Sequence, residues 1–248
     1  MTSPTLRAYQ RAGIDFLASR SRAILADEPG LGKTCQALLA AKLAGLPLLV
    51  VCPPAVAIHW RREADLWLGP AQAARAVRVY GFYDKALVDL EADTFSTVVV
   101  DEVHWIKTPG SIRSKRACRL LARTGGRAWA LSGTLVPNRP VELWPAMLAL
   151  GLLPPEYQAW EAFTGQFCGP KETPWGVDVT GASNLPELRE LLRPHVLRRT
   201  KAEIMPELPP KVWRVLALDL PLAHREKDLD RRELARLREP VAFEALSD

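Results

Sequence analysis

Two short stretches of this chain combine residue types that could bind and cleave a nucleoside triphosphate. Asp27–Thr34 is Asp-Glu-Pro-Gly-Leu-Gly-Lys-Thr, and Val98–His104 is Val-Val-Val-Asp-Glu-Val-His. A glycine-rich loop can curl so that its N–H groups face phosphate oxygens, and a helix that starts behind it adds the positive end of its dipole. An acidic pair at the end of a strand can hold Mg²⁺ and act on an attacking water. The two stretches, in this order, predict a nucleotide site.

Side-chain chemistry assigns the roles within this predicted site. Lys33 would reach the β- and γ-phosphates, and the hydroxyl of Thr34 would bind Mg²⁺. Asp101 would hold the Mg²⁺ shell, and Glu102 would orient or deprotonate water. The predicted catalytic residues are therefore Lys33, Asp101 and Glu102, and the predicted metal ligands are Thr34 and Asp101. The predicted nucleotide-binding residues are Arg7, Gln10, Asp27, Glu28, Pro29, Gly30, Leu31, Gly32, Lys33, Thr34 and Cys35.

Two of these assignments have plain structural alternatives. Asp27 stands where a strict phosphate-loop pattern has glycine, so the loop by itself could be a structural strand–turn–helix. The acidic motif further along the chain favours the nucleotide site. Gln10 could pair with the amino group and a ring nitrogen of adenine, which would select ATP over GTP. The alternative is a solvated amphipathic helix, and the neighbouring loop favours the adenine role.

The surrounding elements predict an α/β fold. Short apolar runs alternate with helical patterns, which is typical of a parallel sheet covered by helices on both faces. Ligands of such sheets bind at the carboxyl ends of the strands, where both motifs lie. The predicted strands are 23–26, 48–52, 76–80, 97–100 and 128–131, and the predicted helices between them are 35–44, 55–68, 84–92 and 111–122.

The pattern changes to helices after residue 139. We predict helices over 141–150, 157–163 and 185–192, with an irregular stretch over 165–183, and a strand over 212–218 before a charged helix over 222–237. The predicted organisation is an ATP-binding core over 1–139, a helical protrusion over 140–206 and a final strand and charged helix over 207–248.

Composition limits the class of protein. With 248 residues, 48% of them hydrophobic, the chain can bury a full core. No apolar run has the length of a membrane span and the first residues have no signal-peptide layout, so we expect an intracellular protein without a membrane partner. It would be cytoplasmic if bacterial or viral and nuclear if eukaryotic. The four cysteines, Cys35, Cys52, Cys118 and Cys168, lack the spacing of metal ligands. We therefore expect free thiols in a reducing compartment.

The positive charge of the chain is concentrated. The net charge is +5, and residues 105–127 contain seven basic and no acidic side chains. This imbalance favours contact with nucleic-acid phosphates over the alternative, a solvated helix face, which usually mixes signs. The predicted DNA contacts are Lys107, Arg113, Lys115 and Arg116, and a weaker basic cluster lies at Arg198–Lys201. The residues predicted to couple the acidic motif to a nearby bound chain are His104, Ser132, Gly133 and Thr134, although the last three could form only a polar turn.

In their order, these motifs resemble the ATPase motor of the SWI/SNF-like branch of helicase superfamily two. The resemblance runs through Leu6–Gln10, Asp27–Thr34, Cys52-Pro53 with Trp60 and Glu63, Asp101–His104 with Lys107, Leu131–Thr134 with Asn138, Glu142 and Leu143, Arg198–Lys201 and Leu208–Lys211. The stretch 175–188 looks most like the annealing-helicase, or fork-remodelling, subfamily. The family too has Asp at the first loop position, whereas Pro29 and Val103 replace its usual residues.

The resemblance implies the first of two RecA-like lobes that hold ATP and Mg²⁺ between them and move on duplex or forked DNA. The family's second-lobe signature, a glutamine followed by spaced arginines, does not occur in this sequence. It therefore implies a second lobe in cis or in trans, and slow hydrolysis by this chain alone. Two alternatives stay open: a non-hydrolysing ATP-dependent DNA-binding module that recruits partners, and a small-molecule kinase, against which the acidic motif and the basic helix argue.

Overall fold

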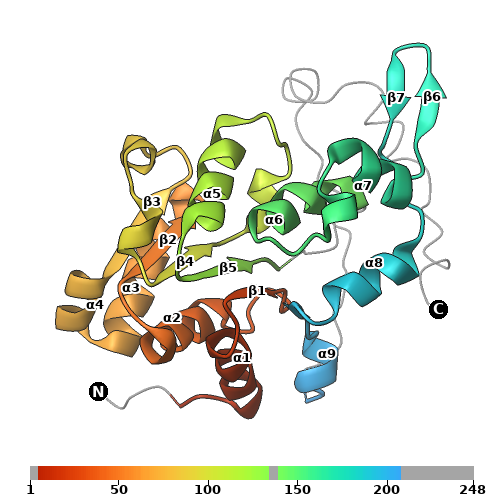
Figure 1. Cartoon of the computed structure of the whole chain (residues 1–248). Helices are drawn as coiled ribbons and strands as arrows, with labels where there is room; N and C mark the ends of the chain where they lie inside the picture. Colours follow the sequence, from red (N-terminus) through yellow and green to blue (C-terminus); the bar gives the residue numbers. More distant parts are fainter. Residues whose placement is uncertain (1–4, 134–138, 208–248) are drawn as a thin grey trace, which may run out of the picture. The chain divides into compact units, whose positions relative to one another are not determined.

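A parallel sheet organises the described part of the chain. The computed structural model describes residues 5–133 and 139–207. Its six-stranded sheet has the order β3-β2-β4-β5-β1-β8, and all its neighbouring strands are parallel (Figure 1). The strands are β1 Arg22–Leu25, β2 Leu48–Cys52, β3 Val77–Gly81, β4 Thr97–Val100, β5 Arg127–Leu131 and β8 Val196–Leu197. The predicted α/β fold with a parallel sheet is confirmed.

Helices cover both faces of this sheet, as predicted (Figure 1). One face packs against α1 Ala8–Ala18, α2 Lys33–Ala44, α3 Ala57–Leu68 and α4 Pro70–Ala76, and the other against α5 Ile112–Arg123, α6 Trp144–Ala149, α7 Trp160–Phe167 and α8 Leu185–Leu192. Strand β4 shows why both faces are apolar. Val98 and Val100 enter the core beneath α5, whereas Val99 enters the core beneath α2, and all three are fully buried.

One predicted helix is wrong. In place of one helix over 84–92, the chain forms a 3₁₀ turn at Lys85–Val88 (η2) and a second one that begins at the end of this range, Ala92–Thr94 (η3). Side chains of α5 explain the difference. Arg116 donates to the main-chain oxygen of Asp84 at 3.3 Å and Arg119 to that of Leu87 at 2.5 Å. These carbonyls are therefore bonded to α5, so tertiary contacts override the local helical pattern.

The region predicted as a helical protrusion contains more than helices. The stretch predicted as irregular includes a hairpin, β6 Lys171–Thr173 and β7 Gly176–Asp178, and strand β8 adds to the edge of the main sheet. The predicted helix over 157–163 is observed at Trp160–Phe167, and the predicted helix over 185–192 has the same bounds as α8. The remaining described elements are η1 Pro54–Val56, η4 Val103–Ile106, η5 Pro140–Leu143, η6 Pro155–Tyr157 and α9 Lys201–Ile204.

All four cysteines are free thiols, as expected. Across residues 5–133 and 139–207, every helix is too short or too polar to cross a bilayer. The strand predicted over 212–218, the helix predicted over 222–237 and the coupling residue Thr134 lie outside the described residues.

Candidate nucleotide-binding site

Four adjacent strands bring the predicted site residues to one edge of the sheet. The carboxyl ends of β4, β5, β1 and β8 lead to Asp101, Ser132, Asp27 and Arg198 respectively. Strand β5 lies between β4 and β1, so the Ser132–Gly133 turn separates the acidic pair from the glycine-rich loop. This is the edge at which parallel sheets bind ligands.

The glycine-rich loop has the backbone that an anion cradle requires. Gly30 and Gly32 have φ values of +88° and +76°, in the left-handed region that favours glycine, and Gly32 caps the N-terminus of α2. A methyl group on Gly133 would lie 2.7 Å from Cγ of Pro29 and 3.5 Å from Nζ of Lys33. The turn after β5 therefore packs directly on the loop, and the donor set of the loop fits a phosphate chain.

Lys33 and the acidic pair share one electrostatic environment. Lys33 Nζ donates to the main-chain oxygen of Asp27 at 2.7 Å. Burial lowers the pKa of Lys33, and the carboxylates of Glu102 and Asp101 oppose this shift. Burial raises the pKa of Asp101, with Glu102 adding to the rise and Lys33 acting against it. The structure therefore brings the three predicted catalytic residues close enough to influence one another's ionisation.

Asp101 is held by two donors. Trp60 Nε1 donates to Oδ2 of Asp101 at 2.7 Å, and the main-chain N–H of Glu102 donates to Oδ1 at 2.9 Å. Trp60 is fully buried in α3, and its position in an apolar pattern indicates only core packing. A hydrogen bond to a buried carboxylate is the role that the pattern misses. Trp60 fixes the orientation of Asp101 and favours its ionised form.

Glu102 has a strained backbone. Its φ of +50° places a residue with a side chain in the left-handed region, at a cost of about 1–3 kcal/mol. The conformation ends β4 and starts the 3₁₀ turn η4. One carboxylate oxygen of Glu102 lies 3.2 Å from Nδ1 of His104, the predicted coupling residue. Strain of this kind gathers at functional sites, where the surrounding structure maintains it.

Two side chains are the predicted ligands of Mg²⁺. In the described part of the chain, no three His, Cys, Asp or Glu side chains are grouped to hold a metal ion. The predicted ligands of Mg²⁺, Thr34 and Asp101, supply one hydroxyl and one carboxylate. That donor set fits Mg²⁺, which binds proteins through one or two carboxylates and completes its shell with phosphate oxygens and water.

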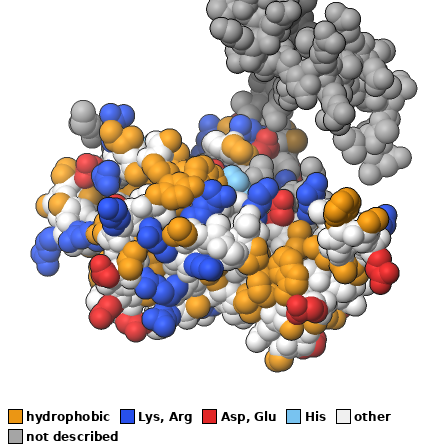
Figure 2. Space-filling model, turned by 90° about the horizontal axis from the view of Figure 1, so that it is seen from above, with side chains coloured by type: hydrophobic (Ala, Val, Ile, Leu, Met, Phe, Trp, Pro, Cys, Tyr) orange, Lys and Arg blue, Asp and Glu red, His pale blue; other side chains and the backbone are white. Residues whose placement is uncertain are grey.

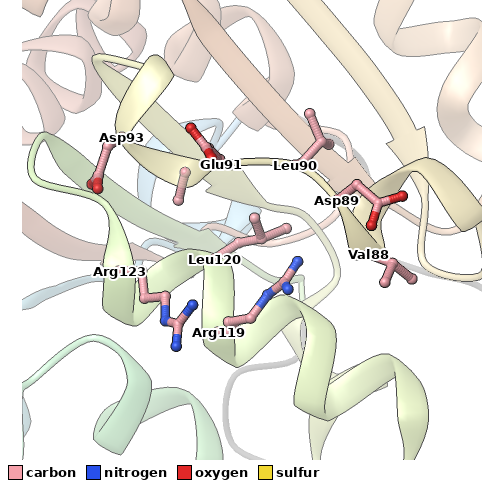
Figure 3. A pocket seen from close by; sticks show the side chains of 9 residues that line it. Val88, Asp89, Leu90, Glu91, Asp93, Arg119, Leu120 and Arg123 are labelled. Carbon is pink, nitrogen blue, oxygen red and sulfur yellow. The ribbon is translucent and has the colours of Figure 1, made fainter.

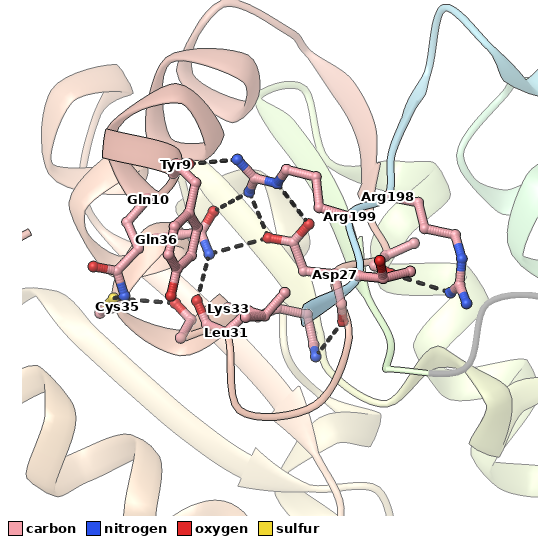
Figure 4. Close-up of polar contacts among 12 residues, drawn as sticks. Tyr9, Gln10, Asp27, Leu31, Lys33, Cys35, Gln36, Arg198 and Arg199 are labelled. Carbon is pink, nitrogen blue, oxygen red and sulfur yellow. Dashed lines mark hydrogen bonds and ion pairs between the residues drawn. The ribbon is translucent and has the colours of Figure 1, made fainter. Parts of the chain in front are cut away.

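Asp27 anchors a buried polar cluster beneath the loop (Figure 4). Its carboxylate is fully buried and faces both Arg199, whose Nε lies 2.9 Å from Oδ1, and Gln36, whose Nε2 lies 3.2 Å from Oδ2. Arg199 also donates to Oε1 of Gln36 at 2.9 Å and to the main-chain oxygen of Tyr9. Asp27 thus contributes to the loop through its main chain and its ion pair, and the guanidinium of Arg199 is engaged in this buried cluster.

Gln10 and its neighbours lie beside the loop. A methyl group on Gly32 would lie 2.6 Å from Nε2 of Gln10, and the same nitrogen lies 3.7 Å from Sγ of Cys35. Burial raises the pKa of Cys35 to about 11, which keeps the thiol protonated. Arg7 makes an exposed ion pair with Glu207 at 3.5 Å. The adenine role of Gln10 stays a prediction.

The basic residues divide into two groups. Figure 2 looks onto the face covered by α5 and α6 and shows Lys and Arg side chains spread over its left half. Lys115 is exposed. Arg113 donates to the hydroxyl of Tyr83 and Arg116 to the main-chain oxygen of Asp84, and within residues 5–133 and 139–207 neither forms an ion pair. Other basic side chains have acidic neighbours: Lys107 pairs with Glu142 at 3.0 Å, and Arg119 and Arg123 share a surface pocket of about 460 Å³ with Asp89, Glu91 and Asp93 (Figure 3).

Sequence comparison assigns the family. The profile of the SNF2-related domain matches residues 9–86 and 77–229. The chain belongs to the SNF2-related family. A relative from Xenopus tropicalis, named SWI/SNF-related matrix-associated actin-dependent regulator of chromatin subfamily A-like protein 1, is 35% identical over 83% of this chain. The human DNA annealing helicase and endonuclease ZRANB3 is 33% identical over 88% of it.

These matches cover most of this chain but only a small part of each relative. The SNF2-related chain spans 24% of the Xenopus relative and 23% of the human one. The solved Sulfolobus solfataricus SWI2/SNF2 ATPase core in complex with dsDNA superposes with a TM-score of 0.62 and 24% sequence identity, over 80% of this chain and 45% of that one. The fold of a RecA-like SNF2 lobe is therefore established, and the predicted resemblance is confirmed.

Trp60→Phe is expected to raise the pKa of Asp101 further and to lower the free energy of unfolding by about 1–3 kcal/mol, because a buried acceptor loses its donor. The lost bond favours the ionised carboxylate, so the deficit is largest at neutral pH and shrinks as the pH falls through the raised pKa of Asp101. Carbon-detected NMR titration and denaturant unfolding measure both effects. Trp129→Phe is the control, since Trp129 is equally buried and its indole donates to the main-chain oxygen of Arg20 at 3.0 Å. An Asp101 pKa that responds equally to both changes would contradict the positioning role.

Proposed function

We propose that this SNF2-related chain is the ATP-binding lobe of a DNA-dependent ATPase that moves on or remodels duplex or forked DNA. One observation carries the proposal: the loop at Lys33 and the acidic pair Asp101–Glu102 converge on one sheet edge, with Gly133 packed between the strand ends against the loop. The relatives named as a regulator of chromatin and as a DNA annealing helicase support the same class.

The side chains at this sheet edge would have different roles in ATP binding and hydrolysis. Lys33 and the loop N–H groups would neutralise phosphate charge, and Gln10, beside the loop, would pair with the base. Thr34 and Asp101 would hold Mg²⁺, which would neutralise part of the charge of the outer phosphates. Glu102 orients or deprotonates the attacking water, beside His104. Ser132 and Gly133, in the turn after β5, would couple the acidic pair to bound DNA.

In this proposal, a second RecA-like lobe, supplied in cis or in trans, completes the ATPase. Transition-state charge in phosphoryl transfer needs a positioned arginine, which is worth about three to five orders of magnitude in rate. We therefore infer slow turnover for these 248 residues alone.

Calorimetry with Mg²⁺ and ATP, followed by phosphate release with and without duplex or forked DNA, tests the proposal. We expect ATP binding and slow hydrolysis. Binding without any hydrolysis, even with a second SNF2 lobe added, would favour the recruitment module. Failure to bind ATP or transfer of phosphate to a small-molecule acceptor would contradict the proposed function.

Replacement of Lys115 and Arg116 by glutamate is expected to weaken DNA binding. The slope of log K against log salt is expected to flatten by about two units, because each lost phosphate contact lowers the magnitude of the slope by about 0.9. ATP binding is expected to stay unchanged, since both residues lie on α5, beyond the acidic motif in the chain, and not in the loop. Fluorescence anisotropy over a salt series measures the slope. The matched control is Lys42→Glu with Arg75→Glu, an equal charge change at exposed positions of α2 and α4. If both double variants change the slope equally, the effect is only net charge and α5 is a solvated face.

A further inference from the structure

Lys201 holds its ammonium against the glycine-rich loop. A methyl group placed on Gly30 would lie 3.2 Å from Nζ and 3.4 Å from Cε of Lys201. The main-chain N–H of Lys201 donates to Oε2 of Glu28 at 2.6 Å. Lys201 therefore lies against the loop at two points, with its main chain at Glu28 and its side chain at Gly30. The sequence pattern assigns it only to a weak basic cluster.

Regular structure fixes this position. The segment that leads to Lys201 runs beside β1 and continues along the loop: Ala26 N–H donates to the main-chain oxygen of Leu197 at 2.7 Å, and Glu28 N–H to that of Arg199 at 2.9 Å. Thr200 then caps α9 in a reciprocal pair with Glu203. The ladder, the buried ion pair of Arg199 and the cap hold Lys201 in place from both sides.

The charge of Lys201 is available for an anion. Among residues 5–133 and 139–207, no carboxylate forms an ion pair with its ammonium. Arg198 lies close enough to Lys33 to act on its ionisation. Three cations, Lys33, Arg198 and Lys201, thus gather at one loop whose N–H groups also carry partial positive charge. A concentration of this kind suits a polyanion and repels itself without one.

We propose that Lys201 is a second lysine ligand of the triphosphate, in addition to Lys33. This assignment rests on the proposed function, because it takes the loop to bind ATP. An ammonium presents three donors on a flexible stem, so it can follow the outer phosphates as a point charge. Lys201 would then discriminate nucleotides by phosphate charge, and would matter little for a nucleotide that carries one phosphate.

Binding of ATP, ADP and AMP to the full chain tests the assignment, with calorimetry in Mg²⁺. Lys201→Met keeps the aliphatic stem on Gly30 and removes the charge, and it is expected to weaken ATP binding about tenfold. Lys201→Arg keeps the charge and is expected to retain affinity within about threefold. AMP binding is expected to be the same for all three proteins. Lys171→Met, on the exposed strand β6, is the control for the loss of one positive charge.

The outcomes separate this inference from the proposed function. If the wild type binds ATP, Lys33→Ala does not and Lys201→Met binds as tightly as the wild type, the loop stands and the assignment of Lys201 is wrong. Equal losses in Lys201→Met and Lys201→Arg, or an equal loss for AMP, would show that Lys201 only packs on the loop. A wild type that does not bind ATP would overturn both.

Discussion

Lys33→Ala is expected to weaken ATP binding by about a hundredfold or more, because it removes a charge-assisted contact from a partly buried site. Burial lowers the pKa of Lys33, while the carboxylates of Glu102 and Asp101 help to keep it charged. Its ammonium is bonded to the main-chain oxygen at the start of the same loop, and so lies where the phosphates are proposed to bind. Calorimetry with Mg²⁺ and ATP measures the loss.

Glu102→Gln is expected to separate binding from chemistry. Glutamine has the same shape, and its amide cannot take a proton, so ATP affinity is expected to persist while hydrolysis falls by about two to four orders of magnitude. The left-handed backbone at this position is retained, since both residues bear the same strain. Single-turnover phosphate release measures the effect, and Glu161→Gln on the exposed side of α7 is the control.

The pair of variants is decisive in combination. Equal ATP affinity in the wild type and Lys33→Ala would remove the assignment of the phosphate loop. Wild-type hydrolysis by Glu102→Gln would instead leave the loop in place and move the water-activating role to another residue. Loss of binding in both variants would show that Glu102 supports the site electrostatically, through the coupling that it shares with Lys33.

Strands were predictable where the local pattern agrees with the tertiary environment. Val98, Val99 and Val100 form an apolar run because both faces of β4 are buried, and that run gives both the strand and its place in the sheet. Residues 84–92 have an equally clear helical pattern, yet arginines of α5 bond their carbonyls. Strand β8, with two residues, is too short to carry any periodicity.

The site was predictable where its residues are contiguous. The loop and the acidic pair each occupy a few consecutive positions, and parallel topology brings their strand ends together. The Asp27–Arg199 pair joins residues 172 positions apart, and only the addition of β8 beside β1 makes them neighbours. Trp60 is similar, because its burial follows from the apolar pattern but the direction of its indole N–H does not. Spacing alone could not reveal either contact.

Arg199→Ala is expected to lower the free energy of unfolding by about 3–5 kcal/mol, because it leaves the Asp27 carboxylate buried without its cation. Asp27 is fully buried and the Arg199 side chain is only 13% exposed, so water cannot replace the lost partner. The same guanidinium joins Tyr9, Gln36 and Asp27, which lie on or next to α1, α2 and β1. Its removal therefore loosens three elements at the base of the loop.

Denaturant unfolding of the full chain measures this loss, and the neighbouring residue supplies the control. Arg198 is exposed, and among the described residues it donates only to the main-chain oxygen of Ala26, at 3.4 Å, so Arg198→Ala is expected to change stability by less than about 0.5 kcal/mol. Asp27→Asn with Arg199→Met removes both charges and is expected to recover part of the stability lost in Arg199→Ala, since no unpaired buried charge remains. Equal stability of Arg199→Ala and Arg198→Ala would mean that the ion pair beneath the loop contributes nothing, and the loop would then owe its shape to its glycines and to α2 alone.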